Sequence, residues 1–140
     1  MRDFGKLGVA SLWLIVLLAG CSPAETQTSA DGDAVGNCDL VIRFNGKAED
    51  REFQVPCPPS STVLTVMRSV PNGSFEFEMI GADNATAFIV SIGGVENEKN
   101  LGDNWVYRVN GKLGDKSSGL FPVQPGDSIV WSFGKYEPSE

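Results

Sequence analysis

The sequence of 140 residues contains no histidine and only three cysteines. Without imidazole, the chain offers no histidine base to activate a nucleophile and no histidine ligand for a metal ion. It also lacks a glycine-rich phosphate-binding motif, and its acidic residues are spread singly, without the paired arrangement of a glycosidase. We therefore expect a protein that is not an enzyme and that uses neither a metal nor a cofactor.

Positive charge is scarce as well. The chain has 11 basic and 18 acidic residues, which gives a formal net charge of −7 at pH 7. Such a surface repels a phosphate backbone, and the sequence has no basic stripe that would offset the repulsion locally. Nucleic acid is therefore not an expected partner.

Long hydrophobic runs are absent apart from one near the N-terminus. Residues 8–20 are apolar and follow Arg2 and Lys6, a pattern that is too short for a comfortable membrane span and typical of a secretory signal peptide. The last residues, Leu18-Ala19-Gly20-Cys21, resemble a bacterial lipobox, in which cleavage precedes a cysteine that then carries acyl chains. The alternative is an ordinary signal peptide followed by a chance cysteine. The sequence thus predicts a lipoprotein signal peptide over residues 1–20 and lipidation at Cys21.

Lipidation would place the protein in the bacterial cell envelope, on the exported side. Each buried acyl methylene contributes about 0.8 kcal/mol, so several chains on Cys21 would make a membrane a lasting partner. Ser22 rather than aspartate follows Cys21, which by resemblance to sorted lipoproteins favours the outer membrane in a host that has one. Removal of residues 1–20 leaves nine basic and seventeen acidic residues, a net charge of −8.

Residues 21–36 are small and polar and contain no aromatic side chain. This composition predicts a lipidated, disordered tether that lets the following domain stand away from the membrane. The stretch Asp31-Gly32-Asp33 could suggest calcium, but the other ligands of a calcium loop are missing at the required spacing. We interpret it as solvated linker.

The other two cysteines, Cys38 and Cys57, are an even pair in an oxidising compartment, which favours a disulfide. Both lie in alternating runs, residues 38–44 and 51–57, separated by a polar loop that suits a hairpin. A disulfide there would add about 3 kcal/mol on the chain-entropy model. The expected register, which matches the apolar faces and the cysteines together, pairs Cys38 with Cys57, Leu40 with Val55 and Ile42 with Phe53.

A short helix is expected after the hairpin, with Ser60 or Ser61 as its N-cap and Pro71-Asn72-Gly73 as its stop. Apolar residues recur there at helical spacing: Val63, Leu64, Val66, Met67 and Val70.

The rest of the chain alternates as strands do. Four further strands are expected over residues 74–80, 87–92, 104–109 and 128–133, and the long segment 111–127 is rich in turn residues. The fold class is therefore α+β, a β-grasp-like mixed sheet in the order β-β-α-β-β-β-β with one covering helix, over residues 37–136. The expected buried faces are Phe75, Phe77 and Met79; Phe88, Val90 and Ile92; Trp105, Tyr107 and Val109; and Ile129, Trp131 and Phe133.

An ordered series of residues in this region resembles a known family. The series runs from Ile92-Gly93-Gly94-Val95 through Trp105-Val106-Tyr107-Arg108-Val109-Asn110-Gly111 to Gly126-Asp127-Ser128-Ile129-Val130-Trp131, with Gly119-Leu120 between. It is similar to the transcobalamin-like C-terminal domain, a largely bacterial domain of unknown function, over about residues 38–135. The resemblance implies a β-grasp-like fold, often tethered or secreted. In animal cobalamin carriers the related domain closes over one side of the corrinoid. We expect no large helical partner domain in this chain, and its sequence offers no histidine for cobalt.

We expect a binding or interaction module whose ligand, a small molecule or an envelope protein, is unknown. The loops offer Asp103, Asn104, Lys112, Lys116, Ser117 and Ser118 as candidate contacts. One alternative is a carrier of a corrinoid or another planar cofactor, with Trp105 or Tyr107 against the ring. A second alternative is a structural envelope lipoprotein. Trp105 and Tyr107 are otherwise core residues that pair with Trp131, and Asn110-Gly111 is then a turn with positive φ.

Overall fold

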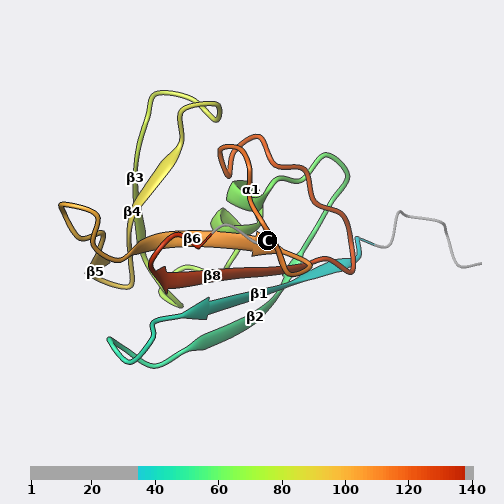
Figure 1. The fold of residues 1–140 in the computed structure, drawn as a ribbon. Helices are drawn as coiled ribbons and strands as arrows, with labels where there is room; N and C mark the ends of the chain where they lie inside the picture. The colour runs from blue at the N-terminus through green and yellow to red at the C-terminus, as the bar shows by residue number, and fades with distance from the viewer. Residues whose placement is uncertain (1–34, 138–140) are drawn as a thin grey trace, which may run out of the picture. The chain divides into compact units, whose positions relative to one another are not determined.

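Strand β8 (Ser128–Gly134) runs through the middle of a five-stranded sheet in the computed structural model, which describes residues 35–137 (Figure 1). β1 lies parallel to β8 on one side, and β6 lies antiparallel to it on the other. The outer strands are antiparallel to their neighbours and complete the order β2-β1-β8-β6-β7. Their bounds are β1 (Asn37–Arg43), β2 (Arg51–Pro56), β6 (Asn104–Val109) and β7 (Lys112–Leu113).

Aromatic side chains hold β6 against β8. Trp105 lies opposite Phe133, Tyr107 opposite Trp131, and Val109 opposite Ile129, and all six side chains are buried. Direct cross-strand pairs of this kind stabilise a sheet beyond the area that they bury. The predicted strands over residues 104–109 and 128–133, and their inner faces, are confirmed.

Three strands form a second, separate sheet, namely β3 (Phe77–Ile80), β4 (Phe88–Ile92) and β5 (Val95–Glu96). Figure 1 shows β3 and β4 crossing one end of the five-stranded sheet, beside β6. The predicted α+β class with a short helix is confirmed, although the strands divide between two sheets. The two-residue strands β5 and β7 follow Gly93-Gly94 and Asn110-Gly111 turns, in which all four residues have positive φ.

The buried face of β4 differs from the prediction. Ala87 and Ile89 are buried, whereas Phe88 is 52% exposed and Val90 is only partly buried. Of the predicted face, only Ile92 lies in the core. Residues on both faces of this strand are apolar, so alternation alone does not determine which face turns inward.

Helix α1 (Val63–Arg68) packs its predicted apolar stripe into the core. Its N-cap is Thr62 rather than Ser60 or Ser61, because Thr62 and Thr65 form a reciprocal capping box. Ser61 is committed elsewhere, since its hydroxyl donates to Pro58 O at 2.6 Å.

The register of the β1–β2 hairpin is two residues away from the one expected. Cys38 pairs with Val55, Leu40 with Phe53, and Cys57 N donates to Gly36 O at 2.8 Å. A shift of two keeps every side chain on its predicted face, so the apolar pattern could not detect it.

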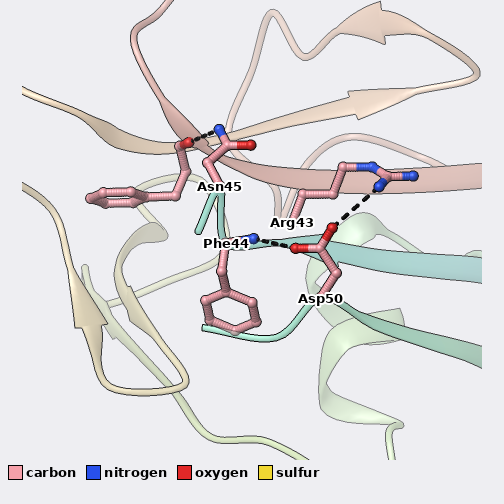
Figure 2. A network of polar contacts seen from close by, with 5 residues as sticks. Arg43, Phe44, Asn45 and Asp50 are labelled. Atoms are coloured by element: carbon pink, nitrogen blue, oxygen red, sulfur yellow. Dashed lines mark hydrogen bonds and ion pairs between the residues drawn. The ribbon is translucent and has the colours of Figure 1, made fainter. Parts of the chain in front are cut away.

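The loop that joins β1 to β2 accounts for the shift. Figure 2 shows the Asp50 carboxylate accepting the Phe44 backbone N–H at 2.8 Å and meeting Arg43 at 3.3 Å. These contacts tighten the loop and draw Arg51 opposite Ile42. Asn45, in the left-handed region with φ of 49°, donates its side-chain amide to Phe133 O and so joins the loop to the end of β8.

The predicted disulfide is not formed, because both Cys38 and Cys57 are free cysteines. Both thiols are fully buried, and the Cys38 Sγ donates to Gln124 O at 3.1 Å. Burial first, and then the neighbouring Cys57 thiol, raise the pKa of Cys38 to about 12. At neutral pH, Cys38 is therefore a protonated, unreactive thiol.

Within residues 35–137 no helix is long and apolar enough to cross a membrane. The predicted signal peptide, the predicted lipidation site Cys21 and nearly all of the predicted tether lie outside the described residues.

A thiol count tests the state of the cysteines. In the Cys21→Ser chain, we expect a thiol reagent to label neither Cys38 nor Cys57 in the native state, because both are buried and Cys38 is protonated. Unfolding in urea without a reductant should then expose two reactive thiols. Recovery of none after unfolding would contradict the structure and reinstate the disulfide.

Candidate functional site

A cavity of about 170 Å³ lies among β6, β8, the start of β4 and the segment that follows β7. Its lining is mostly aromatic and aliphatic, with two serines and a single charged residue among the residues that the structure describes. The lining residues are Ala87, Phe88, Ile89, Trp105, Val106, Tyr107, Leu113, Gly114, Lys116, Ser117, Ser118, Trp131 and Tyr136.

Five of the eight predicted contact residues line this cavity, namely Trp105, Tyr107, Lys116, Ser117 and Ser118. The other three do not. Asn104 borders a separate, open hollow, and its side-chain amide donates to Gly102 O. The Asp103 backbone N–H donates to the Glu98 carboxylate. Lys112 is exposed on β7. Loops and the inner face of β6 therefore contribute to one site, although the sequence presented them as competing interpretations.

The wall formed by residues 114–118 is fixed at several points. The Tyr107 hydroxyl donates to Lys116 O at 2.6 Å, and the Ser117 hydroxyl lies 3.0 Å from Ala87 O at the start of β4. Ser118 O accepts the Leu64 N–H of the first turn of α1 at 2.9 Å, which satisfies a backbone donor left free at the helix start. Figure 1 shows α1 and this segment on the same side of the larger sheet. The cavity is thus built into the packed fold.

Two glycines permit this close packing. A Cβ on Gly114 would lie 2.1 Å from Tyr107 Cζ, and a Cβ on Gly119 would lie 2.4 Å from Asn84 O. Any larger residue at Gly114 would push the Tyr107 ring or the wall itself out of place.

Two buried polar atoms in lining residues have no hydrogen-bond partner within the described part of the chain. They are Ser118 Oγ and Trp131 Nε1, and each residue is only 3% exposed. Trp105 provides the contrast, because its Nε1 donates to Val95 O at 2.7 Å. A buried polar atom without a partner costs about 1–3 kcal/mol, and both atoms are fully enclosed, so neither is exposed to the cavity.

The electrostatics of the cavity are simple. Within residues 35–137, Lys116 is the one charged residue in the lining, and it is exposed. Burial, and then the charge of Asp115, raise the pKa of Tyr107 to about 12, although the bond to Lys116 O acts in the opposite direction. Tyr107 is therefore a neutral donor at physiological pH.

This chemistry suits binding better than catalysis. Among the described residues no base bonds to the Ser118 hydroxyl, and the sequence has no histidine. Among residues 35–137, no group of three or more metal-ligating side chains lies together. An aromatic cavity with a few polar groups is the usual form of a small-molecule site.

Sequence reasoning missed part of the lining. Trp131 was predicted as core only, and Phe88 was assigned to the wrong face of its strand. Leu113, Gly114 and Tyr136 come from segments without a recognisable pattern. The one signal in the sequence was that both faces of β4 are apolar, which indicates that the face opposite the core is not simply exposed to solvent.

Comparison with known protein families identifies the family of the chain. Residues 60–135, more than half of the sequence, match the family described as "Domain of unknown function (DUF4430)". The chain belongs to this family. No curated protein matches the chain significantly.

Solved structures agree on the fold of this DUF4430 chain. Haptocorrin in complex with Cbi has a TM-score of 0.63 and 21% identity over 73% of this chain, and the match spans 25% of haptocorrin. A protein from Ruminococcus gnavus that is proposed to bind metal has a TM-score of 0.56 and 14% identity over 73% of this chain, and 99% of that protein is covered. The predicted resemblance to a transcobalamin-like domain of unknown function is therefore confirmed.

Replacement of Ser118 tests whether its hydroxyl is unpaired. We expect Ser118→Ala to raise the free energy of unfolding by about 1 kcal/mol, because it removes a buried polar atom that has no partner. Ser61→Ala is the matched control. Ser61 is equally buried, but its hydroxyl bonds to Pro58 O, so its loss should lower the free energy of unfolding by about 1 kcal/mol. Urea denaturation measures both, and a destabilised Ser118→Ala would contradict the assignment.

Proposed function

We propose that this protein is a non-enzymatic binding module that holds a small molecule in the cavity between β6, β4 and residues 114–118. The aromatic character of the cavity lining carries the proposal. Trp105, Tyr107 and Trp131 contribute aromatic rings to the lining, and Lys116 and Ser117 contribute polar groups. A fixed wall and an apolar lining supply the rest of a binding site.

The absence of catalytic partners supports a binding role over an enzymatic one. A serine nucleophile needs a base within hydrogen-bond reach, and no group in the described residues bonds to the Ser118 hydroxyl. Cys38 and Cys57 are buried in the β1–β2 region, and neither lines the cavity.

The proposal includes display of the module on the exported side of a bacterial envelope, through lipid on Cys21 and a tether over residues 21–36. The support is the lipobox-like Leu18-Ala19-Gly20-Cys21 and the small, polar composition of the tether. A module that captures a small molecule outside the cell would need such an anchor to stay at the surface.

A corrinoid is the second candidate, because the fold resembles haptocorrin in complex with Cbi. The cavity limits how a corrinoid could bind. At about 170 Å³ it is smaller than the pockets of about 300–1,000 Å³ that enclose drug-sized ligands, and a corrinoid is larger still. The ring would have to rest on the surface, over exposed Phe88 and Tyr136 at the cavity.

Retention of a native ligand tests the binding role. We expect protein isolated from bacterial envelopes to release a small molecule on denaturation, detectable by mass spectrometry. Ala87→Leu should abolish retention, because Ala87 is buried in the lining and a larger side chain fills the cavity. Ala48→Leu, in the exposed hairpin loop, should retain it. Equal retention by both variants would contradict the site.

An absorbance titration with cyanocobalamin in the same preparation separates the two candidates. A spectral change that survives Ala87→Leu would favour a corrinoid on the surface over a small ligand in the cavity.

The anchor has its own test. The full chain produced in bacteria should incorporate radiolabelled palmitate and partition with membranes, and the Cys21→Ser variant should lose both properties. Labelling of the Cys21→Ser variant, or release of the wild-type chain by salt alone, would overturn the lipid anchor.

A further inference from the structure

We infer that the cavity binds the C-terminal end of a short, extended peptide, which pairs its main chain with the free edge of β6. The inference rests on the proposed small-molecule site and names the class of its ligand. Two main-chain groups of β6, the Trp105 C=O and the Tyr107 N–H, lead to it.

The main chain of β6 turns its odd-numbered residues away from β8. The Trp105 N–H donates to Asn97 Oδ1 at 2.7 Å, and Tyr107 O accepts the Gly114 N–H at 2.9 Å. Neither Asn97 nor Gly114 belongs to β8. Successive residues of a strand direct their N–H and C=O groups to opposite edges, and both groups of one residue share an edge. The main-chain groups of Trp105 and Tyr107 therefore face the edge of β6 that β8 does not occupy.

Two of these groups lack a hydrogen-bond partner among residues 35–137. β7 ends at Leu113, and the Gly114 N–H that reaches Tyr107 O is not matched by a return bond from the Tyr107 N–H. Two residues earlier, no donor in the described chain reaches the Trp105 C=O. Trp105 is 4% exposed and Tyr107 is 8% exposed. Buried main-chain groups are nearly always paired, so a partner from outside the described chain is expected here.

The cavity lies at this open edge. Three successive residues of β6 line it, namely Trp105, Val106 and Tyr107. Successive side chains of a strand point to opposite faces of the sheet, so a cavity that touches all three borders the edge of the strand. Residues 87–89, at the start of β4, form another wall, and β4 belongs to the other sheet. A ligand in the cavity can therefore reach the edge to which the two unpaired groups point.

The spacing of the two groups matches one extended residue of a partner chain. They flank Val106, because one belongs to the residue before it and the other to the residue after it. In a parallel bridge, one partner residue donates its N–H to the first group and accepts from the second with its own C=O. Peptides that add to a sheet edge gain affinity from such bonds and specificity from pockets that hold alternate side chains.

The cavity then holds the side chain of the following peptide residue. Paired residues place their side chains on the same face, so the peptide residue opposite Val106 points to the outer face and the next one points inward. On the inner side, Tyr107 and Trp131 line the cavity. An apolar cavity of about 150 Å³ accommodates benzene. The cavity here, at about 170 Å³, therefore has room for one side chain of leucine size.

The charge of the lining favours a free carboxylate at the end of the peptide. A parallel partner leads its C-terminal end past Tyr107, whose hydroxyl bonds to Lys116 O in the wall at residues 114–118. Lys116 is the charged residue of the described lining, and it is exposed. Its ammonium group attracts a carboxylate and repels the amino terminus of a peptide in the opposite orientation. The site therefore suits a peptide that ends in an apolar residue.

Titration of the ¹⁵N-labelled Cys21→Ser chain with N-acetyl-glycyl-leucine tests the inference. We expect the backbone N–H signal of Tyr107 to move downfield, because it gains a hydrogen bond. The Val109 N–H serves as the internal reference, because Val109 already pairs with Lys112. The same peptide with its glycine nitrogen methylated cannot donate to the Trp105 C=O and should bind about five- to tenfold more weakly. The peptide amide, which lacks the carboxylate, should also bind more weakly.

An ester in place of the amide at Tyr107, introduced with the matching hydroxy acid, removes the unpaired N–H from the protein. It should weaken binding of N-acetyl-glycyl-leucine about five- to tenfold. The same change at Val109 is the matched control, because both esters weaken a carbonyl that faces β8 but Val109 pairs with Lys112. The Val109 ester should bind the peptide as the unmodified chain does, and should lower the urea midpoint of unfolding more than the Tyr107 ester.

The outcomes separate this inference from the proposed function. If the methylated peptide and the Tyr107 ester both bind normally and Ala87→Leu abolishes binding, the cavity holds the ligand without the strand edge. The inference is then wrong, and the proposed function stands. Binding that Ala87→Leu leaves unchanged would place the peptide away from the cavity and would also overturn the inference. If no peptide binds at millimolar concentration, the inference fails, and retention of the native ligand decides the proposed function separately.

Discussion

The pairing of Tyr107 with Trp131 across β6 and β8 is the contact on which both the sheet and the cavity depend. It places an indole in the middle of the central sheet, next to a phenol whose hydroxyl reaches out to Lys116 O. The ring pair is therefore core on one side and cavity wall on the other. The same pairing buries the Trp131 N–H without a partner in the described part of the chain.

Packing around this pair extends to the hairpin. The Phe44 ring meets Trp105 edge-on at 5.3 Å, and the Asp50 carboxylate holds the Phe44 backbone in place. Gly93 belongs to the same cluster, because a Cβ there would lie 2.9 Å from the Phe44 ring. The exposed Arg43–Asp50 ion pair adds little stability by itself. Two buried polar atoms without a partner in the described residues, Ser118 Oγ and Trp131 Nε1, cost this core stability.

The sequence predicted the elements because their patterns are local, as in the alternation of 104–109 and 128–133 or the Asn110-Gly111 turn. It could not predict the hairpin register, because a shift of two residues leaves every side chain of β1 on the same face. The sequence could not predict which face of β4 is buried, because Phe88 and Ile89 are both apolar. The predicted loop residues Lys116, Ser117 and Ser118 line the cavity together with Trp131 and Ala87. Their meeting depends on segments about thirty residues apart along the chain, which join through contacts such as Ser117 to Ala87. No single stretch of sequence records that meeting.

A high-resolution crystal structure of the ligand-free chain is the measurement that tests the account most directly. It should show an open cavity beside the Tyr107–Trp131 pair, with Ser118 Oγ and Trp131 Nε1 lacking protein partners and meeting at most ordered water. The account is contradicted if Phe88 and Tyr136 fill the space and both atoms bond to groups of the protein. In that case the aromatic strip would be core alone, and the domain would offer no cavity for a ligand.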